Sequence, residues 1–451
     1  MRDFKFLTTL ILLFVTITGF AKNRASLDEV PLDTIVEKSL HFVEASQKKQ
    51  NEEFYFKGEW PVEMRSYFLP ALLGVGKFFA KPTDEPTAFA TSSISNLLAS
   101  IYFENSKYNQ IKNMISVGLE SVDQNYKSGD VYSYYPEMDY KGTIVRGPRA
   151  GAAYVPKFIQ GLTNVPADAD TTSVTYTAKY FNSLINNNLA APFIVPANAL
   201  NTFSTFRDEN RTSHYYNWLD GIRKSGAFMT WFIDEKSTAM PRGVFAKPDK
   251  GARIPFIFND VDCVVNANVL RMLTLTKNQN QTGYKESCDV LNFSIEKNLE
   301  SQCGIYYPNS MAVFFTISNA YKAGASCLEK SKPKALQKIQ EAQDYSEGSW
   351  SNTPGIGRTD KVQSTALAMI ALMNYSEKEN LRYNYSIKLG IKYLLAQAKI
   401  KSESEIYWDG EVFFSAVAQA RNTVLWRSDS YTTALVGLAL AQSQNYLQGM
   451  Q

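Results

Sequence analysis

Two aspartates, Asp260 and Asp262, are the residues in this sequence whose type and spacing most suggest catalysis. They stand at the start of an apolar stretch. If a helix begins between them, Asp262 and Asn266 lie four residues apart and share one face. A carboxylic acid kept neutral in a dry cavity could protonate a carbon–carbon double bond there. Alternatively, one of the two aspartates simply caps the helix, because Asp is a favoured N-cap residue.

A second group of candidates lies in the segment from Tyr132 to Arg149, which mixes aromatic and acidic residues with glycine. Rings such as Tyr135 could stack on the faces of sugar rings, and Glu137 and Asp139 could provide the acid and the base of a glycosidase. These residues therefore indicate a possible glycan site. The alternative is that a tyrosine-rich loop packs over a helical barrel.

Other kinds of catalytic site find little support in the sequence. The chain has two histidines and no HExxH or paired CxxC pattern, so we expect no metal site. It has no nucleophile elbow, P-loop or complete dinucleotide fingerprint, and we expect no cofactor. Four cysteines, Cys263, Cys288, Cys303 and Cys327, could form one or two disulfides, and three connectivities are open if all four pair.

The elements that must position these residues are helices of two kinds, together about 12–14 in number. Segments with apolar residues three and four apart and a charged face predict outer helices. Segments almost free of charge after their first turn must be buried on most sides and predict an inner ring. The outer set is Leu32–Gln47, Asn109–Asn125, Thr172–Ile185, Gly283–Leu299, Pro333–Gln343 and Tyr383–Gln397; the inner set is Val62–Phe79, Gly147–Leu162, Val261–Leu275, Asn309–Ala323, Val362–Asn374 and Asp429–Ala441.

Acidic residues stand near the start of several inner helices: Glu63, Asp262, Asp360 and Asp429. Parallel inner helices would gather their N-termini at one end of the ring, where carboxylates and helix dipoles could form a ligand site. We therefore consider Asp360 and Asp429 candidate binding residues. Here too, the alternative is that each acid caps its own helix.

A repeated phrase supports a ring of helix pairs. Gly348-Ser349-Trp350 precedes Ser364-Thr365-Ala366-Leu367, and Trp408-Asp409-Gly410 precedes Thr432-Thr433-Ala434-Leu435. Repeated helix pairs that cannot bury their faces alone must stack, in an open solenoid or in a closed ring. Trp350 and Trp408 are added to the candidate binding residues, because they lie in the loops before inner helices.

This repeat resembles the Gln/Trp-type repeat of the terpenoid cyclase and protein prenyltransferase superfamily. The resemblance implies an all-α fold of the α/α-toroid type, with inner and outer rings of helices. Asp260-Val261-Asp262-Cys263 also resembles the Asp-x-Asp-Asp motif of class II terpene cyclases, whose middle Asp protonates an alkene or epoxide, and the Asp-Cys pair of oxidosqualene cyclases. By this resemblance Asp262 is the catalytic acid and Asp260 its companion, although Val264-Val265 replaces the residues that follow in the family.

The N-terminus carries Arg2 and Lys5 before an apolar run of 14 residues, Leu7 to Phe20, and the small residue Ala21. The run is too short for a transmembrane helix and is typical of a signal peptide. We expect residues 1–21 to be removed, residues 22–451 to form one domain, and the protein to be periplasmic or extracellular. The net charge of +3 gives no reason to expect nucleic acid as a partner.

Three functions remain open from the sequence. The first is a terpene-cyclase-like enzyme, or a binding protein for isoprenoid lipids, with possible peripheral contact with a membrane. The second is a hydrolase or lyase that acts on extracytoplasmic glycans. The third is a non-catalytic binding protein on the same scaffold, because a fold alone does not determine a function.

Overall fold

The computed structural model of the chain describes residues 27–66, 82–140, 142–149, 164–186, 193–209, 224–233, 251, 252, 254, 259–351, 360–376, 383–416 and 424–448. The predicted signal peptide lies outside these residues, and its cleavage stays a prediction. None of the described helices is long and apolar enough to span a membrane.

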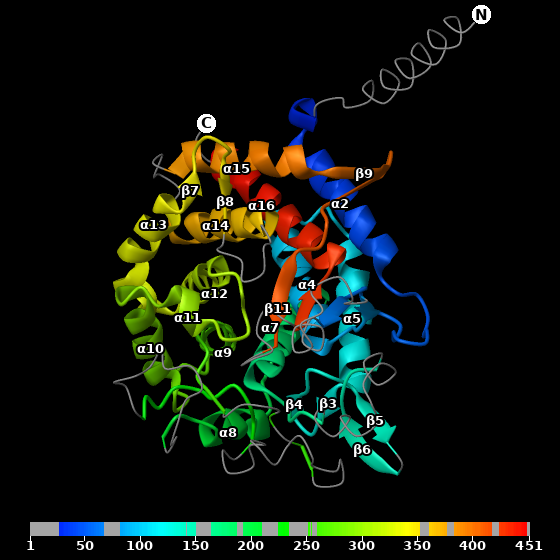
Figure 1. Cartoon of the computed structure of the whole chain (residues 1–451), viewed down its shortest axis with the longest axis vertical. Helices are drawn as coiled ribbons and strands as arrows, with labels where there is room; N and C mark the ends of the chain where they lie inside the picture. Colours follow the sequence, from blue (N-terminus) through cyan, green and yellow to red (C-terminus); the bar gives the residue numbers. More distant parts are fainter. Residues whose placement is uncertain are drawn as a thin grey trace, which may run out of the picture.

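Six helices form a closed inner ring in the described part of the chain (Figure 1). Each packs against the next along the chain, and the last packs against the first. Every residue of the fifth helix from Gln363 to Tyr375 is buried, as expected for a helix surrounded by others. The six are α4 (Ala88–Glu104), α7 (Ala169–Asn186), α9 (Cys263–Leu275), α12 (Met311–Lys322), α14 (Lys361–Tyr375) and α16 (Asp429–Gln448).

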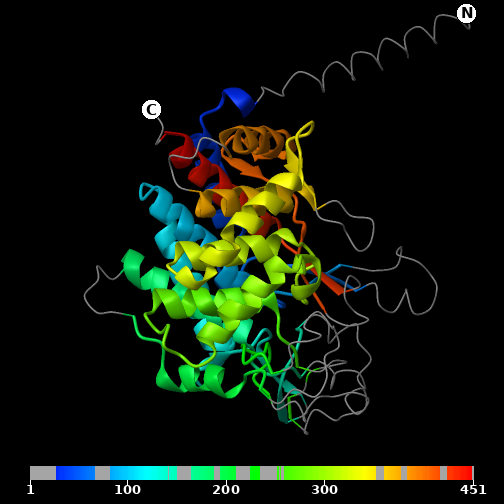
Figure 2. The ribbon, with the colours of Figure 1, turned by 90° about the vertical axis from the view of Figure 1, so that its left-hand side faces the viewer.

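A second layer of helices surrounds this ring. The helix α2 (Leu32–Ser46) packs on α16, so that the first (blue) and last (red) long helices lie side by side (Figures 1 and 2). Outside the other inner helices lie α5 (Gln110–Asn125), α8 (Ala197–Thr205), α10 (Tyr284–Glu296), α13 (Lys332–Glu341) and α15 (Asn384–Gln397). Shorter pieces are η1 (Leu27–Glu29), α11 (Glu300–Cys303) and η7 (Ser326–Ser331). The predicted α/α toroid is confirmed.

Short antiparallel strands occupy the connections between helices. One sheet has the order β11 (Val412–Ser415), β12 (Val424–Arg427), β1 (Glu63–Ser66) and β2 (Thr83–Asp84). Four two-stranded sheets pair β3 (Lys127–Ser128) with β4 (Val131–Tyr132), β5 (Glu137–Tyr140) with β6 (Thr143–Arg146), β7 (Gln343–Asp344) with β8 (Ser349–Trp350), and β9 (Lys399–Ser402) with β10 (Glu405–Tyr407).

The first two inner helices differ from the prediction. The segment predicted as an inner helix from Val62 begins as strand β1, so Glu63 lies in a sheet opposite Arg427. Of the predicted inner helix at 147–162, the described residues 147–149 are not helical, and the rest lies outside the described chain. The structure instead has α4, which was not predicted, and α7, which was predicted as an outer helix.

The hydroxyl-rich composition of α4 and α7 explains this difference. Their buried faces carry many Ser and Thr residues, which pattern analysis scores as polar. Ser95 and Thr177 donate hydrogen bonds to backbone carbonyls four residues earlier, and Ser92 and Thr175 bond to each other across the two helices at 2.9 Å. Hydroxyls that are satisfied in this way can be buried without a large penalty.

The tryptophan repeat has a structural basis. The indole N–H of Trp350 donates to the carbonyl of Ile339 in α13, and its backbone N–H donates to Thr365 in α14. Trp408 likewise donates to Leu394 in α15 and to Thr433 in α16. Each buried tryptophan therefore links an outer helix, through its indole, to the inner helix that follows, through its backbone N–H.

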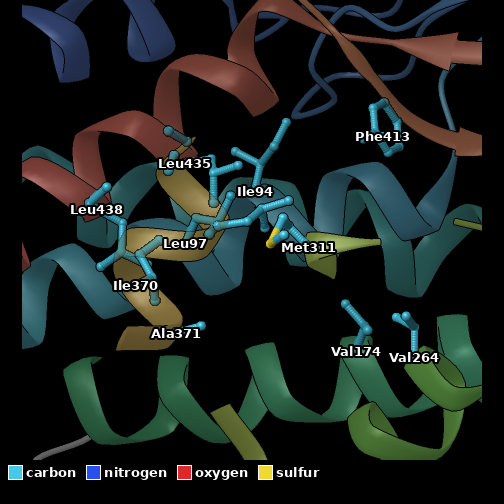
Figure 3. Packing of buried hydrophobic residues seen from close by; sticks show 14 of the residues in the cluster. Ile94, Leu97, Val174, Val264, Met311, Ile370, Ala371, Phe413, Leu435 and Leu438 are labelled. Atoms are coloured by element: carbon cyan, nitrogen blue, oxygen red, sulfur yellow. The ribbon is translucent and has the colours of Figure 1, made fainter. Parts of the chain in front are cut away.

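The larger of two hydrophobic clusters in the described part of the chain includes side chains from all six inner helices (Figure 3). The cysteines pair as Cys263–Cys303 and Cys288–Cys327, which is one of the three connectivities left open by the sequence. Two disulfides are typical of proteins in an oxidising compartment. Examples from the core, one for each inner helix in chain order, are Ile94, Val174, Val264, Met311, Ile370 and Leu435.

Candidate functional site

The first turns of neighbouring inner helices bond to one another, so their N-termini gather at one end of the ring. Asn309, just before α12, donates to Ser364 at the start of α14 at 2.9 Å, and Gln363 donates to Thr432 at the start of α16 at 2.9 Å. We call this end the N-terminal rim. The predicted gathering of N-termini is therefore present, and Asp262, Asp360 and Asp429 all lie on it.

Two buried aspartates at the start of α7, Asp168 and Asp170, have the most unusual environment on the rim. Asp168 precedes the helix, and its Oδ1 accepts a hydrogen bond from the N–H of Thr171 at 2.6 Å. In the described part of the chain, its Oδ2 has no hydrogen-bond partner. Asp170 accepts hydrogen bonds from Asn268 Nδ2, at 2.8 Å, and from the Tyr307 hydroxyl.

The environment of the pair affects the two acids differently. Burial raises the pKa of Asp168 from 3.8 to about 8. Burial also raises the pKa of Asp170, but only to about 6, because the hydrogen bonds from Tyr307 and Asn268 oppose the effect of burial. At neutral pH Asp168 therefore keeps its proton, whereas Asp170 is protonated in a minority of molecules and mainly below about pH 6. A raised pKa of this kind is the property that a buried general acid needs.

An aromatic cluster lies next to this pair. Phe414, on β11, is at its centre, with ring-centroid distances of 4.9 Å to Tyr134, 5.5 Å to Phe89 and 5.7 Å to Tyr307. Because Tyr307 also bonds to Asp170, the rings begin directly beside the acid. Aromatic faces attract positive charge. The cluster comprises Phe89, Tyr134, Tyr135, Trp231, Tyr306, Tyr307, Phe413, Phe414, Trp426 and Tyr431.

Asp262, the acid predicted from the sequence, is the N-cap of α9. Its Oδ1 accepts from the amides of Val264 (2.7 Å) and Val265 (3.1 Å), and its Oδ2 accepts from those of Ile305 and Tyr306 (3.2 Å). Burial raises its pKa to about 7, although these amides oppose the rise. Each of its oxygens already accepts from two amides, which leaves neither oxygen a free lone pair, whereas each oxygen of Asp170 accepts from a single donor. Asp262 is therefore poorly placed to protonate a ligand. The structure favours the cap alternative.

Asn266 and Asp260, the two candidates nearest to Asp262 in the sequence, form hydrogen bonds with the backbone of residues 228–230. Asn266 accepts from the N–H of Phe228 and donates to its carbonyl, both at 3.0 Å. Asp260 is buried, and its carbonyl accepts from the N–H of Thr230 at 2.9 Å. These contacts fix residues 228–230 against the start of α9. A ligand-binding role for Asn266 and a catalytic role for Asp260 stay predictions.

The candidate residues near the starts of α14 and α16 each make different contacts. Asp360 is buried at the N-cap of α14, and Asp429 accepts from the N–H of Gly410 at 2.6 Å. Glu411, which sequence reasoning missed, accepts from the first amides of α14, and burial raises its pKa to about 8. Trp350 and Trp408 are buried between the helix layers.

The residues of the glycan hypothesis are separated from one another. Glu137 and Asp139 are exposed on the hairpin β5–β6, where Glu137 pairs with Arg146 and Asp139 accepts from the N–H of Gly142 at 2.7 Å. Tyr135, by contrast, is buried in the aromatic cluster, edge-on to Tyr134. The structure therefore does not bring the two acids together with the rings.

Asp168 and Asp170 are functional candidates that sequence reasoning missed. They repeat the Asp-x-Asp spacing of Asp260 and Asp262, and like them they stand at the start of a buried helix. This was an available signal, but it lay at the edge of a segment predicted as an outer helix. Among the described residues, no group of three or more His, Cys, Asp or Glu residues could hold a metal ion.

Comparisons with models of known protein families and with curated proteins find no match. Solved structures do match. A variant of the type II terpene cyclase MstE from Scytonema, in complex with geranylgeranyl dihydroxybenzoate, has a TM-score of 0.56 at 13% identity, covering 92% of this chain and 97% of that one. A protein from Actinoplanes has a TM-score of 0.53 at 10% identity, covering 92% and 100%.

The same architecture also occurs in an enzyme that acts on sugars. Cellobiose 2-epimerase from Bacillus thermoamylovorans has a TM-score of 0.51 at 12% identity, covering 91% of this chain and 98% of that one. Identities this low show the shared fold and nothing finer. In its fold, this chain is an α/α toroid, similar to the terpene cyclase and to the epimerase.

Proposed function

We propose that this protein is a terpene-cyclase-like enzyme that starts its reaction by protonating a carbon–carbon double bond of a neutral isoprenoid, with Asp170 as the acid. The observation that carries the proposal is the position of Asp170: buried, at the start of an inner helix and directly beside the aromatic cluster. Asp170 is also the third residue of the run Asp168-Ala169-Asp170-Thr171, which resembles the Asp-x-Asp-Asp motif of the cyclases except at its last position.

The hydrogen bonds to Asp170 suit an acid that must donate its proton to carbon. Burial raises the pKa of Asp170 to about 6, so the neutral, proton-donating carboxyl is far more populated than it would be in water and predominates below pH 6. When the proton leaves, the new C–H bond takes the electron pair of the double bond, and a carboxylate remains on Asp170. Tyr307 and Asn268 already direct donors at its two oxygens, so this carboxylate is stabilised as it forms.

The aromatic cluster suits the second requirement, which is to stabilise the carbocation that the proton creates. Phe89, Phe414 and Tyr134 provide ring faces close to Tyr307 and hence to Asp170. Cation–π attraction is strongest where water is excluded. The reaction would end when the cation loses a proton or is captured by a nucleophile, so that a neutral product results.

The compartment is part of the proposal. The predicted signal peptide and the two disulfides both support an exported protein. A neutral isoprenoid dissolved in a membrane could reach such a protein. We therefore propose a lipid-soluble substrate taken up outside the cytoplasm.

The test is an assay of the disulfide-bonded protein from residue 22 onward with three isoprenoids: the neutral squalene and geranylgeraniol, and geranylgeranyl dihydroxybenzoate, which carries a carboxylate away from its isoprenoid chain. The last is the substrate in the Scytonema complex. We expect a cyclised product by mass spectrometry, and a loss of at least about 100-fold in Asp170→Asn, because an amide cannot donate the proton.

The matched control is Asp289→Asn, the same substitution at an exposed position on the outer helix α10. Its activity should equal that of the wild type. Full activity in Asp170→Asn would remove Asp170 from the mechanism. No product from any of the three substrates, with correctly folded wild-type protein, would count against the isoprenoid proposal itself.

A further inference from the structure

A short segment without regular secondary structure, Gly304 to Tyr307, carries the hydroxyl that meets the acid. It forms the first part of the connection from α11 to α12, and its last residue, Tyr307, donates to Asp170. A hydrogen bond of this kind requires the donor to be held to within a few tenths of an ångström. The segment has no helix or strand of its own to hold it.

Two consecutive residues at the start of α9, its N-cap Asp262 and its first residue Cys263, hold this segment. Asp262 accepts from the N–H groups of Ile305 and Tyr306 through its Oδ2, and Cys263 is joined by a disulfide to Cys303, immediately before the segment. The cap of α9 needs only Oδ1, which already accepts from two amides of its own helix. The second oxygen and the disulfide therefore serve the segment rather than the helix.

We propose that Asp262 and the Cys263–Cys303 disulfide are positioning elements that hold Tyr307 against Asp170. The inference rests on the proposed function, because it gives Asp262 and this disulfide a role in maintaining the strength of the acid. The sequence resemblance made Asp262 the catalytic acid and Cys263 its neighbour. In this proposal both residues instead support an acid on another helix, Asp170.

The groups that face Asp170 allow a clean test. In the described part of the chain, the titratable groups that interact with it are Asp168, Asp262, Tyr307 and Tyr431. Replacing Cys263 and Cys303 by Ser changes none of these groups and adds no charge. A change in the pKa of Asp170 in that variant must therefore come from a change in position.

The chain also offers a matched control. The disulfides Cys263–Cys303 and Cys288–Cys327 close loops with sequence separations of 40 and 39 residues, so their effects on the entropy of the unfolded chain should be alike. Only the first is attached to the segment that carries Tyr307. Cys288→Ser/Cys327→Ser therefore reports the general effect of losing a disulfide.

The experiment follows the protonated carboxyl band of Asp170 by infrared spectroscopy during a pH titration, with each variant's Asp170→Asn derivative as the reference. Tyr307→Phe removes the hydrogen bond that lowers the pKa of Asp170, so its pKa should rise by roughly one pH unit. Cys263→Ser/Cys303→Ser should show a rise in the same direction, and combining it with Tyr307→Phe should add little. The Cys288→Ser/Cys327→Ser control should titrate like the wild type.

An unchanged pKa in Cys263→Ser/Cys303→Ser, or full additivity with Tyr307→Phe, would overturn the proposal. If that variant does not fold, the folded Cys288→Ser/Cys327→Ser protein is reduced instead, because Cys263–Cys303 is then its one disulfide. Infrared titration needs no substrate. A confirmed shift without turnover of any isoprenoid would support the positioning role and reject the proposed reaction.

Discussion

At the scale of single residues, the site depends on two aspartates that are both buried but are held in different ways. Asp170 receives two side-chain donors, whereas Asp168 has one oxygen bonded to an amide and one without a partner in the described chain. The pKa values of about 6 and about 8 follow from that difference. Asp170 is therefore the stronger acid of the two, and Asp168 stays neutral at pH 7. A neutral Asp168 limits the negative charge beside Asp170.

Asp168→Asn should change how the stability of the protein depends on pH. Because the pKa of Asp168 is raised from 3.8 to about 8, its contribution to stability is present below pH 3.8 and is lost as the pH rises through about 8. Asn removes this titration and keeps the cap acceptor for Thr171. Between pH 4 and 8, the Tm of the wild type should fall relative to that of the variant, as followed by calorimetry. Parallel Tm curves would contradict the buried titration.

At the scale of elements, the turn that precedes an inner helix also contributes to the packing of the two helix layers. The turn that carries Trp350 contains Gly348 at a φ of +86°, and a Cβ there would lie 2.5 Å from the carbonyl oxygen of Leu389. Only glycine fits both the backbone conformation and the close approach of α15. This is why the Gly-Ser-Trp phrase was a reliable signal in the sequence.

Gly348→Ala should be clearly destabilising, and Gly142→Ala is its matched control. Both glycines have positive φ, +86° and +79°, but a Cβ at Gly142 meets nothing within 4 Å. The conformational cost of about 1–2 kcal/mol should therefore be common to both, with a further loss from the backbone overlap in Gly348→Ala. Urea unfolding of the two variants measures the difference. Equal losses would mean that α15 moves away without cost.

The same scale explains which helices could be predicted. The charge-free segments leading into α9, α12, α14 and α16 indicated inner helices, and the structure has them there. The helices α4 and α7 were not predicted as inner helices, because their buried hydroxyls form hydrogen bonds with their own backbone and with each other. Ser92 and Thr175 are an example of a pair across the two helices. A pattern that treats every Ser and Thr as a surface residue cannot detect such pairing.

At the scale of the whole molecule, the closed ring gathers six helix N-termini and so assembles a site from residues that are far apart in the sequence. The contact of Asp170 with Tyr307 spans 137 positions. The sequence indicated a rim of acids but could not tell which acid would lie beside the aromatic cluster. We predicted Asp262 from its motif. Nothing in the sequence shows that the amides of Ile305 and Tyr306 fold back onto its second oxygen.

The most direct test of the central claim is deuterium transfer from the acid. Wild-type protein equilibrated in heavy water carries deuterium on the Asp170 carboxyl, and protonation of the double bond places that deuterium on carbon. We expect each cyclised product molecule to contain one deuterium, at the carbon that begins the reaction, as located by mass spectrometry and NMR. A cyclised product without deuterium would contradict initiation by an exchangeable acid and with it the role of Asp170.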